Sequence, residues 1–136
     1  MPGLFGSSCY AVENEKKMKE LGITHILTVA KYLEPCFPDM ITYKCLQVED
    51  TPRENLKPYF EECADFIENA LEGGGRVVVH CEAGVSRSGT VTVAYLMRKN
   101  KWRRDEALAF TRKQRPNFSP NEGFMDQLLE YEKEIL

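Results

Sequence analysis

Four residues in the segment VVVHCEAGVSRSGTV (residues 77–91) have types and a spacing suited to phosphate chemistry: Cys81, Gly84, Arg87 and Ser88. A short loop that leads into a helix can direct several backbone N–H groups at one point, where the helix adds partial positive charge. Gly84 permits the tight turn, and the planar guanidinium of Arg87 can bind two oxygens at once. The segment therefore predicts a site for a tetrahedral oxyanion, with phosphate as the first choice.

The same positive field acts on the thiol of Cys81. A cysteine near a helix N-terminus and an arginine can have its pKa lowered from about 8.5 to about 3.5–7.5. A Cys81 thiolate would be placed for in-line attack on the phosphorus of a bound ester. The alternative is that Cys81 is a small buried core residue, which would leave the spacing of Gly84, Arg87 and Ser88 unexplained.

Strands and helices alternate along the chain, which predicts an α/β fold. Apolar or β-branched runs indicate strands in ITHILTV (23–29), ITYKCLQV (41–48) and RVVVHC (76–81). Helices are expected over about 12–21, 56–71, 88–100 and 104–113, and from 120 to the end. We expect a single domain over 1–136 with three layers, in which a mainly parallel central sheet of about five strands is flanked by helices. Sites in such sheets form beyond the carboxyl ends of the strands, where Cys81 lies.

The last helix has a start signal in the sequence SPNEGF. Ser119 is expected as the N-cap, Pro120 as the first helical residue and Glu122 as the partner that completes a capping box. Asn121 would then be a polar residue of the first helical turn, a common place for asparagine.

A leaving alkoxide or phenolate needs a proton, so a carboxyl group from another loop must reach the phosphate site. The polar loop after the second strand, LQVEDTPREN, offers Asp50 and Glu49. Asp39, in the preceding loop, is a third candidate.

Composition excludes several classes of protein. The net charge is −3 and no aromatic stacking array accompanies the short basic clusters, so we expect no nucleic-acid binding. No apolar run is long enough to span a bilayer, and no secretory or lipidation signal stands out, so we expect no membrane segment. The five cysteines are scattered without C-x-x-C spacing, so neither a disulfide framework nor a metal site is expected, and the cytoplasm or nucleus is the expected location.

The stretch HCEAGVSRS (residues 80–88) matches the H-C-x-x-G-x-x-R-S signature of the protein tyrosine phosphatase superfamily. Its AGVSRS part most resembles the dual-specificity phosphatases, including the small atypical and MAP-kinase-phosphatase-like catalytic domains. Segments such as GITHILTVA, YFEECADFI and PNEGF are similar to that family as well, so the resemblance covers nearly the whole chain. The family often begins with a longer version of the GLFGSS segment found here, which leaves the pairing of the first strand open.

The resemblance implies hydrolysis of phosphate esters in two steps, through a phosphocysteine and without cofactor or metal. It implies that Cys81 is the nucleophile, Arg87 the phosphoryl clamp and Ser88 the hydroxyl that supports the leaving thiolate. His80 resembles the residue that orders the loop, and the D-x-x-x-x-N-L context selects Asp50 as the general acid. The residues expected to bind the phosphoryl group are Glu82, Ala83, Gly84, Val85, Ser86, Arg87 and Asn121.

The substrate implied is a phosphoprotein carrying phosphotyrosine and phosphoserine or phosphothreonine, with a MAP kinase as one candidate, and the enzyme is expected to act as a monomer. A non-protein substrate, namely a phosphoinositide, glycan or RNA 5′-triphosphate, is the first alternative. Phosphoinositide members often carry lysines in the loop, whereas this loop has Glu82 and no lysine. A non-catalytic phosphopeptide-binding module is the second alternative, although such relatives have lost the nucleophile.

Overall fold

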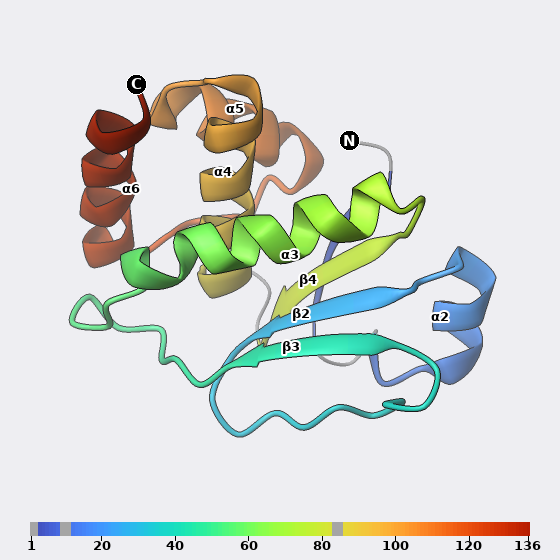
Figure 1. Ribbon diagram of the computed structural model, residues 1–136. Helices are drawn as coiled ribbons and strands as arrows, with labels where there is room; N and C mark the ends of the chain where they lie inside the picture. The colour runs from blue at the N-terminus through green and yellow to red at the C-terminus, as the bar shows by residue number, and fades with distance from the viewer. Residues whose placement is uncertain (1–2, 9–11, 83–85) are drawn as a thin grey trace.

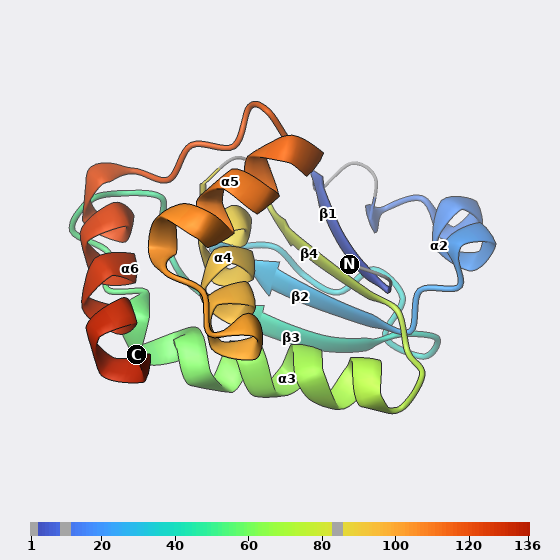
Figure 2. The same cartoon turned by 90° about the horizontal axis from the view of Figure 1, so that it is seen from above.

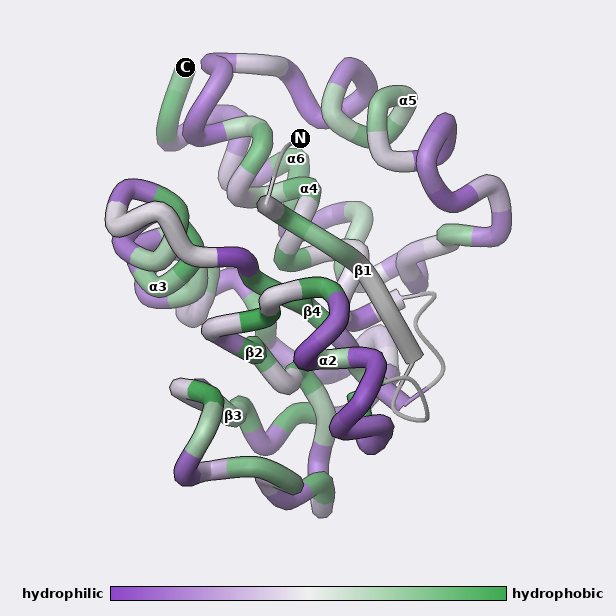
Figure 3. The backbone as a smooth tube through the Cα atoms, turned by 90° about the vertical axis from the view of Figure 1, so that its right-hand side faces the viewer, coloured by the Kyte–Doolittle hydropathy of each residue, from purple (hydrophilic) through white to green (hydrophobic). Residues whose placement is uncertain are grey.

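The computed structural model describes residues 3–8, 12–82 and 86–136. Four parallel strands form its central sheet in the order β1-β4-β2-β3. Figure 1 shows β4, β2 and β3 side by side, and Figure 2 and Figure 3 show β1 next to β4. The strands are β1 (Leu4–Ser8), β2 (His25–Val29), β3 (Thr42–Leu46) and β4 (Val77–Cys81). The predicted α/β fold with a parallel sheet is confirmed, with four strands in the described residues where about five were expected. All five residues of β4 are buried, as expected for a strand between two neighbours in a covered sheet.

Helices cover both faces of this sheet, which gives the three predicted layers. They are α2 (Glu15–Leu21), α3 (Phe60–Glu72), α4 (Arg87–Asn100), α5 (Arg104–Gln114) and α6 (Glu122–Ile135), with a short 3-10 helix η1 (Lys57–Tyr59) before α3. Alternate side chains of a strand point to opposite faces, so Leu27 and Val79 pack in the large core with α3 to α6. Ile26 and Val78 pack on the other face in a smaller core that includes Met18 of α2. Figure 2 shows α4, α5 and α6 gathered together, away from α2.

The predicted helices are present, but three of them begin later than expected: α2 at Glu15 rather than 12, α3 at Phe60 rather than 56 because residues 57–59 form η1, and the last helix. Gly22 ends α2 in the left-handed conformation, with φ 67°, as its position predicts. The predicted N-cap of α6 was wrong, because the helix begins at Glu122 and Asn121 is the capping residue. The Oδ1 atom of Asn121 accepts the backbone N–H of Phe124 at 2.9 Å, which satisfies one of the unpaired donors of the first turn.

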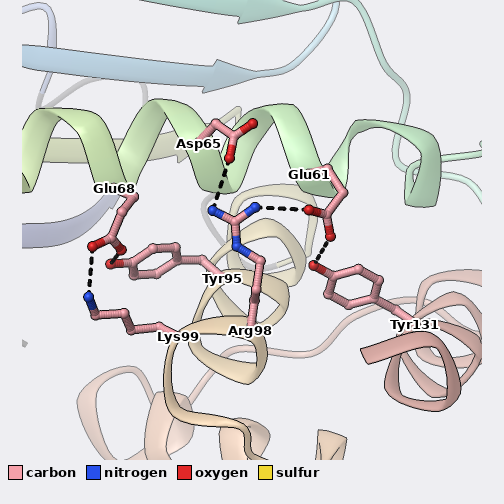
Figure 4. Close-up of polar contacts among 7 residues, drawn as sticks. All are labelled: Glu61, Asp65, Glu68, Tyr95, Arg98, Lys99 and Tyr131. Atoms are coloured by element: carbon pink, nitrogen blue, oxygen red, sulfur yellow. Dashed lines mark hydrogen bonds and ion pairs between the residues drawn. The ribbon is translucent and has the colours of Figure 1, made fainter. Parts of the chain in front are cut away.

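A polar network joins α3 to α4 and α6 (Figure 4). Arg98 donates to Glu61 at 2.9 Å and pairs with Asp65 at 3.0 Å. The Tyr131 hydroxyl of α6 donates to the same Glu61.

Further along α3, Glu68 accepts the Tyr95 hydroxyl and pairs with Lys99, both at 2.7 Å. Burial and the neighbouring carboxylates raise the pKa of both phenols, so they remain hydrogen-bond donors. The network fixes α4 and α6, whose N-termini face the candidate site.

No helix in residues 3–8, 12–82 and 86–136 combines the length and the apolar character needed to cross a membrane.

Candidate active site

Cys81 ends β4 at the carboxyl edge of the sheet, and α4 begins at Arg87, so the predicted order of strand, loop and helix is present. Cys81 is 2% exposed, and Ser86, Arg87 and Ser88 are buried beside it. Of the predicted phosphate-binding residues, Ala83, Gly84 and Val85 lie outside the described residues. The described ends of this loop therefore bring the sulfur and the helix N-terminus to the same edge of the sheet.

The sulfur of Cys81 and the hydroxyl of Ser88 are hydrogen-bonded, with Sγ and Oγ 3.3 Å apart. Both residues are buried, Ser88 at 1% exposure, so water does not compete for this contact. A thiol donates in such a pair, whereas a thiolate accepts the hydroxyl proton. Hydrogen bonding to the charged form favours that form, so the serine hydroxyl favours ionised sulfur.

Arg87 is held along one edge of its guanidinium group. Its Nη1 donates to the backbone carbonyl of Val48 at 3.1 Å, and Nη2 lies 3.8 Å from the Glu82 carboxylate, whose side chain is 73% exposed. The Nε atom is buried and has no hydrogen-bond partner in the described part of the chain. A buried N–H without a partner is costly, and an anionic oxygen would satisfy it. The arrangement fits a guanidinium oriented by the protein to bind an oxyanion.

The first turn of α4 approaches its neighbours closely at Gly89. A Cβ atom at that position would lie 2.1 Å from the Phe118 ring, and Phe118 is itself buried. The absence of a side chain therefore allows the helix end that carries Arg87 and Ser88 to pack against this ring.

His80 lies on the opposite face of β4 from Cys81, because successive side chains of a strand alternate. Its Nε2 is hydrogen-bonded to the Thr28 hydroxyl at 2.8 Å, across the register of β2 and β4. Burial lowers the pKa of His80 to about 4, so its imidazole is neutral near pH 7. A hydrogen bond with the Cys81 backbone opposes this lowering of the pKa, so His80 acts on Cys81 through the backbone.

The neutral state of His80 predicts a loss of stability in acid. The unfolded imidazole has a pKa of 6.5 and the folded one about 4, so the unfolded state binds more protons between these values. As pH falls from 6.5 to 4, the free energy of unfolding should drop by about 3 kcal/mol on account of this residue. Urea unfolding across this range measures the loss, and His80→Gln should remove that part of the slope. Parallel slopes for the two proteins would contradict the assignment.

Asp50 is joined to the start of α6 by Asn121. The side-chain Nδ2 of Asn121 donates to Asp50 Oδ1 at 2.9 Å, and its backbone N–H donates to Ser86 Oγ at 3.2 Å. Asn121 therefore links the loop of Asp50 to the loop that follows Cys81, in addition to capping α6. Its interpretation as an ordinary polar residue of the first turn does not account for these two contacts.

The two other candidate acids are placed differently. The Glu49 carboxylate forms an ion pair with Lys31, at 2.9 Å. Asp39 precedes β3, and in a parallel sheet that position is at the amino edge, opposite the Cys81 edge. Among the described residues, Asp50 is the one of the three carboxylates that contacts a residue also bonded to Ser86.

Two contributors to the site were not predicted. Val48 acts through its carbonyl oxygen, so its side-chain type carries no signal, whereas Thr28 is a polar residue within the apolar run ITHILTV. Among the described residues, no group of three or more His, Cys, Asp or Glu side chains is arranged to hold a metal ion.

Comparison with known proteins shows the family of this chain. Residues 4–134 match the family described as dual specificity phosphatase, catalytic domain. The chain is 46% identical over 133 residues to dual specificity protein phosphatase 1 of Arabidopsis thaliana, covering 98% of this chain and 67% of the relative. It is 40% identical over 136 residues to human dual specificity protein phosphatase 1, covering all of this chain and 37% of that relative.

The fold is also similar to that of solved structures related to this family. The crystal structure of the human tyrosine phosphatase-like serine/threonine/tyrosine-interacting protein superposes with a TM-score of 0.93 at 34% identity, covering 98% of this chain and 93% of that one. The chain spans little more than a third of the human phosphatase, so it corresponds to one part of that longer protein. It belongs to the dual specificity phosphatase catalytic domain family and is a cysteine-dependent protein phosphatase.

Proposed function

We propose that this chain hydrolyses phosphotyrosine and phosphoserine or phosphothreonine in proteins through a phosphocysteine formed on Cys81. The observation that carries the proposal is the joint placement of the Cys81 sulfur, 3.3 Å from Ser88 Oγ, and the buried Arg87 guanidinium at the end of β4. A nucleophile and an oxyanion clamp at one helix N-terminus are what phosphoryl transfer to sulfur requires.

In the first step, the Cys81 thiolate attacks phosphorus in line with the ester oxygen. The S–P bond forms, the P–O bond to the substrate breaks, and protonated Asp50 gives its proton to the leaving oxygen. Arg87 Nε and Nη2 bind equatorial phosphoryl oxygens, while the Val48 carbonyl holds Nη1 and fixes the plane of the group. The backbone N–H groups at the N-terminus of α4 add to this binding of the phosphoryl oxygens.

In the second step, Asp50 takes a proton from a water molecule that attacks the phosphocysteine. The new O–P bond forms, the S–P bond breaks, and the electron pair returns to sulfur as a thiolate. The Ser88 hydroxyl donates to that sulfur and stabilises it as a leaving group. His80 supports both steps from the opposite face of β4. Its hydrogen bond to Thr28 fixes the backbone that leads into Cys81.

A phosphoprotein is favoured over a polyanionic small molecule as substrate. The Glu82 carboxylate lies at the edge of the site, 73% exposed, and the sequence places no lysine among residues 82–86. Additional phosphate groups on an inositol ring or an RNA 5′ end would meet a like charge there. The resemblance to enzymes that inactivate MAP kinases makes a doubly phosphorylated activation-loop peptide the first substrate to test.

We further propose that residues 1–136 form one domain that acts as a monomer in the cytoplasm or nucleus. One core that runs from β2 to α6 supports the single domain. Cys36, Cys45 and Cys63 form no disulfide among the described residues, which is compatible with a reducing compartment.

The assignment of Asp50 predicts a change in the pH profile. Activity should rise with ionisation of Cys81 and fall as Asp50 loses its proton, which gives a bell-shaped profile of kcat/KM. Asp50→Asn should lower kcat/KM for phenyl phosphate roughly 100-fold and flatten the descending limb, because asparagine has no proton to lose. Steady-state kinetics between pH 5 and 8 measure both effects.

Two matched carboxylates serve as controls for this experiment. Glu49→Gln removes the neighbouring charge and Asp39→Asn removes the one at the far edge of the sheet, and both variants should retain the descending limb. An unchanged limb in Asp50→Asn would remove Asp50 from its role. Absence of both turnover and a burst of phenol, with phosphopeptide binding retained, would instead identify a binding module.

A further inference from the structure

The loop that carries Asp50, residues 49–57, is closed by its own glutamate. Glu54 Oε1 accepts the backbone N–H of Glu49 at 2.7 Å, and Oε2 accepts that of Asn55 at 3.1 Å. The backbone N–H of Glu54 donates to the Thr51 carbonyl at 3.1 Å, which makes a turn between them. One carboxylate therefore fixes the backbone immediately before Asp50 and the backbone that leaves the loop.

A glutamine of α6 holds the far end of the same loop. Gln127 Oε1 accepts the backbone N–H groups of Leu56 and Lys57, at 2.7 and 2.8 Å, and Nε2 donates to the Glu54 carbonyl at 2.8 Å. Leu56 is fully buried, so its N–H has little access to water as an alternative partner. Removing the amide would leave two donors and one acceptor of the loop unsatisfied.

The loop also touches α6 one turn earlier. A Cβ atom on Gly123 would lie 2.1 Å from the Pro52 carbonyl oxygen, so the loop backbone rests directly on the helix. Gly123 and Gln127 are four residues apart and share one face of α6. Asn121, at the start of the helix, donates to Asp50. The helix α6 therefore contacts the loop at three positions: Asn121, Gly123 and Gln127.

We propose that Gln127, acting through Glu54, is a positioning residue that sets where the Asp50 carboxyl group lies relative to the leaving oxygen. The inference rests on the proposed role of Asp50 as general acid. Its physical basis is that proton transfer needs donor and acceptor within hydrogen-bond reach, so a small displacement of the loop weakens it strongly. If the contacts of Gln127 and Glu54 only stabilised the fold, their loss would lower kcat/KM equally for every substrate.

The test compares aryl phosphates whose phenols differ in acidity. A strongly acidic phenol leaves without a proton, whereas unsubstituted phenol needs the general acid. Gln127→Ala should therefore lower kcat/KM roughly 10- to 100-fold for phenyl phosphate, and by less than about threefold for an aryl phosphate with an acidic phenol. The descending limb of the pH profile for phenyl phosphate should weaken in parallel. The ratio kcat/KM is the right quantity because it covers the steps up to release of the first product.

Three further variants keep the test decisive. Gln127→Glu keeps an oxygen that can accept both backbone N–H groups and replaces the Nε2 donor to the Glu54 carbonyl, so its kcat/KM for phenyl phosphate should fall between those of the wild type and Gln127→Ala. Glu54→Ala breaks the tie to the Glu49 N–H without altering α6, and should show the same dependence on the leaving group. Glu130→Gln, on the same helix, with a 64% exposed side chain and an ion-pair distance of 3.8 Å to Lys57, should match the wild type. Circular dichroism confirms that each variant is folded.

Asp50→Asn, measured in the same series, separates the possible failures. Suppose that the loss of kcat/KM in Asp50→Asn depends on the leaving group, while the folded Gln127 and Glu54 variants lower kcat/KM equally for all substrates. The positioning role is then wrong and the general acid stands. If Asp50→Asn itself shows no dependence on the leaving group, the general acid is wrongly assigned and the inference falls with it.

Discussion

Replacing Cys81 with serine is expected to lower kcat for aryl phosphates by about 10⁴-fold or more, because the hydroxyl stays protonated where the thiol ionises. The loss should appear in turnover and not in binding. Arg87 and the first turn of α4 are unchanged in this variant, so a phosphotyrosine peptide should still bind, as measured by calorimetry. Steady-state hydrolysis of a chromogenic aryl phosphate measures the loss of turnover.

Cys63 provides the matched control for this substitution. It lies in the core on α3, fully buried, and burial raises the pKa of its thiol to about 12. A thiol of that acidity is not ionised at neutral pH, so Cys63→Ala should keep wild-type kcat provided that the protein is folded. Substantial turnover by Cys81→Ser would contradict the covalent mechanism.

Replacing Arg87 with lysine is expected to lower kcat/KM roughly 10³-fold although the positive charge is kept. The guanidinium uses Nη1 to bond the Val48 carbonyl and still presents Nε and Nη2 to the phosphoryl oxygens. A lysine ammonium is a single point charge, so it cannot occupy both positions at once. Buried at 8% exposure, Arg87 has little solvent around it to compensate.

Arg103→Lys is the control for that loss, because the Arg103 side chain is 74% exposed and pairs only loosely with Glu132, at 3.8 Å. It should leave kcat and KM unchanged, as expected of an exposed ion pair. If Arg87→Lys retained most of its activity, charge alone would explain catalysis, and the geometric role assigned to the guanidinium would be wrong.

The strand, loop and helix around Cys81 could be predicted because their determinants are local. An apolar run, a cysteine, an arginine and a serine all lie within residues 77–88, and each has one expected place in such a unit. The parallel sheet followed from the alternation of strands and helices for the same reason. The cap of α6 was mispredicted because SPNE also fits the capping pattern, and the sequence does not show that Asn121 has further partners in Asp50 and Ser86.

The supports of the site could not be predicted because they join residues far apart in the chain. Arg87 contacts a carbonyl 39 residues away, and Gln127 contacts backbone groups 70 to 73 residues away. Backbone carbonyls and N–H groups look alike at every position of a sequence, so only the packing of α6 and α4 onto the sheet selects which of them are used.

The central claim is that phosphate passes through the sulfur of Cys81. Quenching the enzyme in acid during turnover of an aryl phosphate, followed by intact-protein mass measurement and peptide mapping, tests it most directly. The account predicts that a fraction of the protein gains one phosphoryl group, that the group maps to the peptide containing Cys81, and that Asp50→Asn, impaired in the second step, retains it longer. Sustained turnover with no phosphoryl group on that peptide would contradict the account.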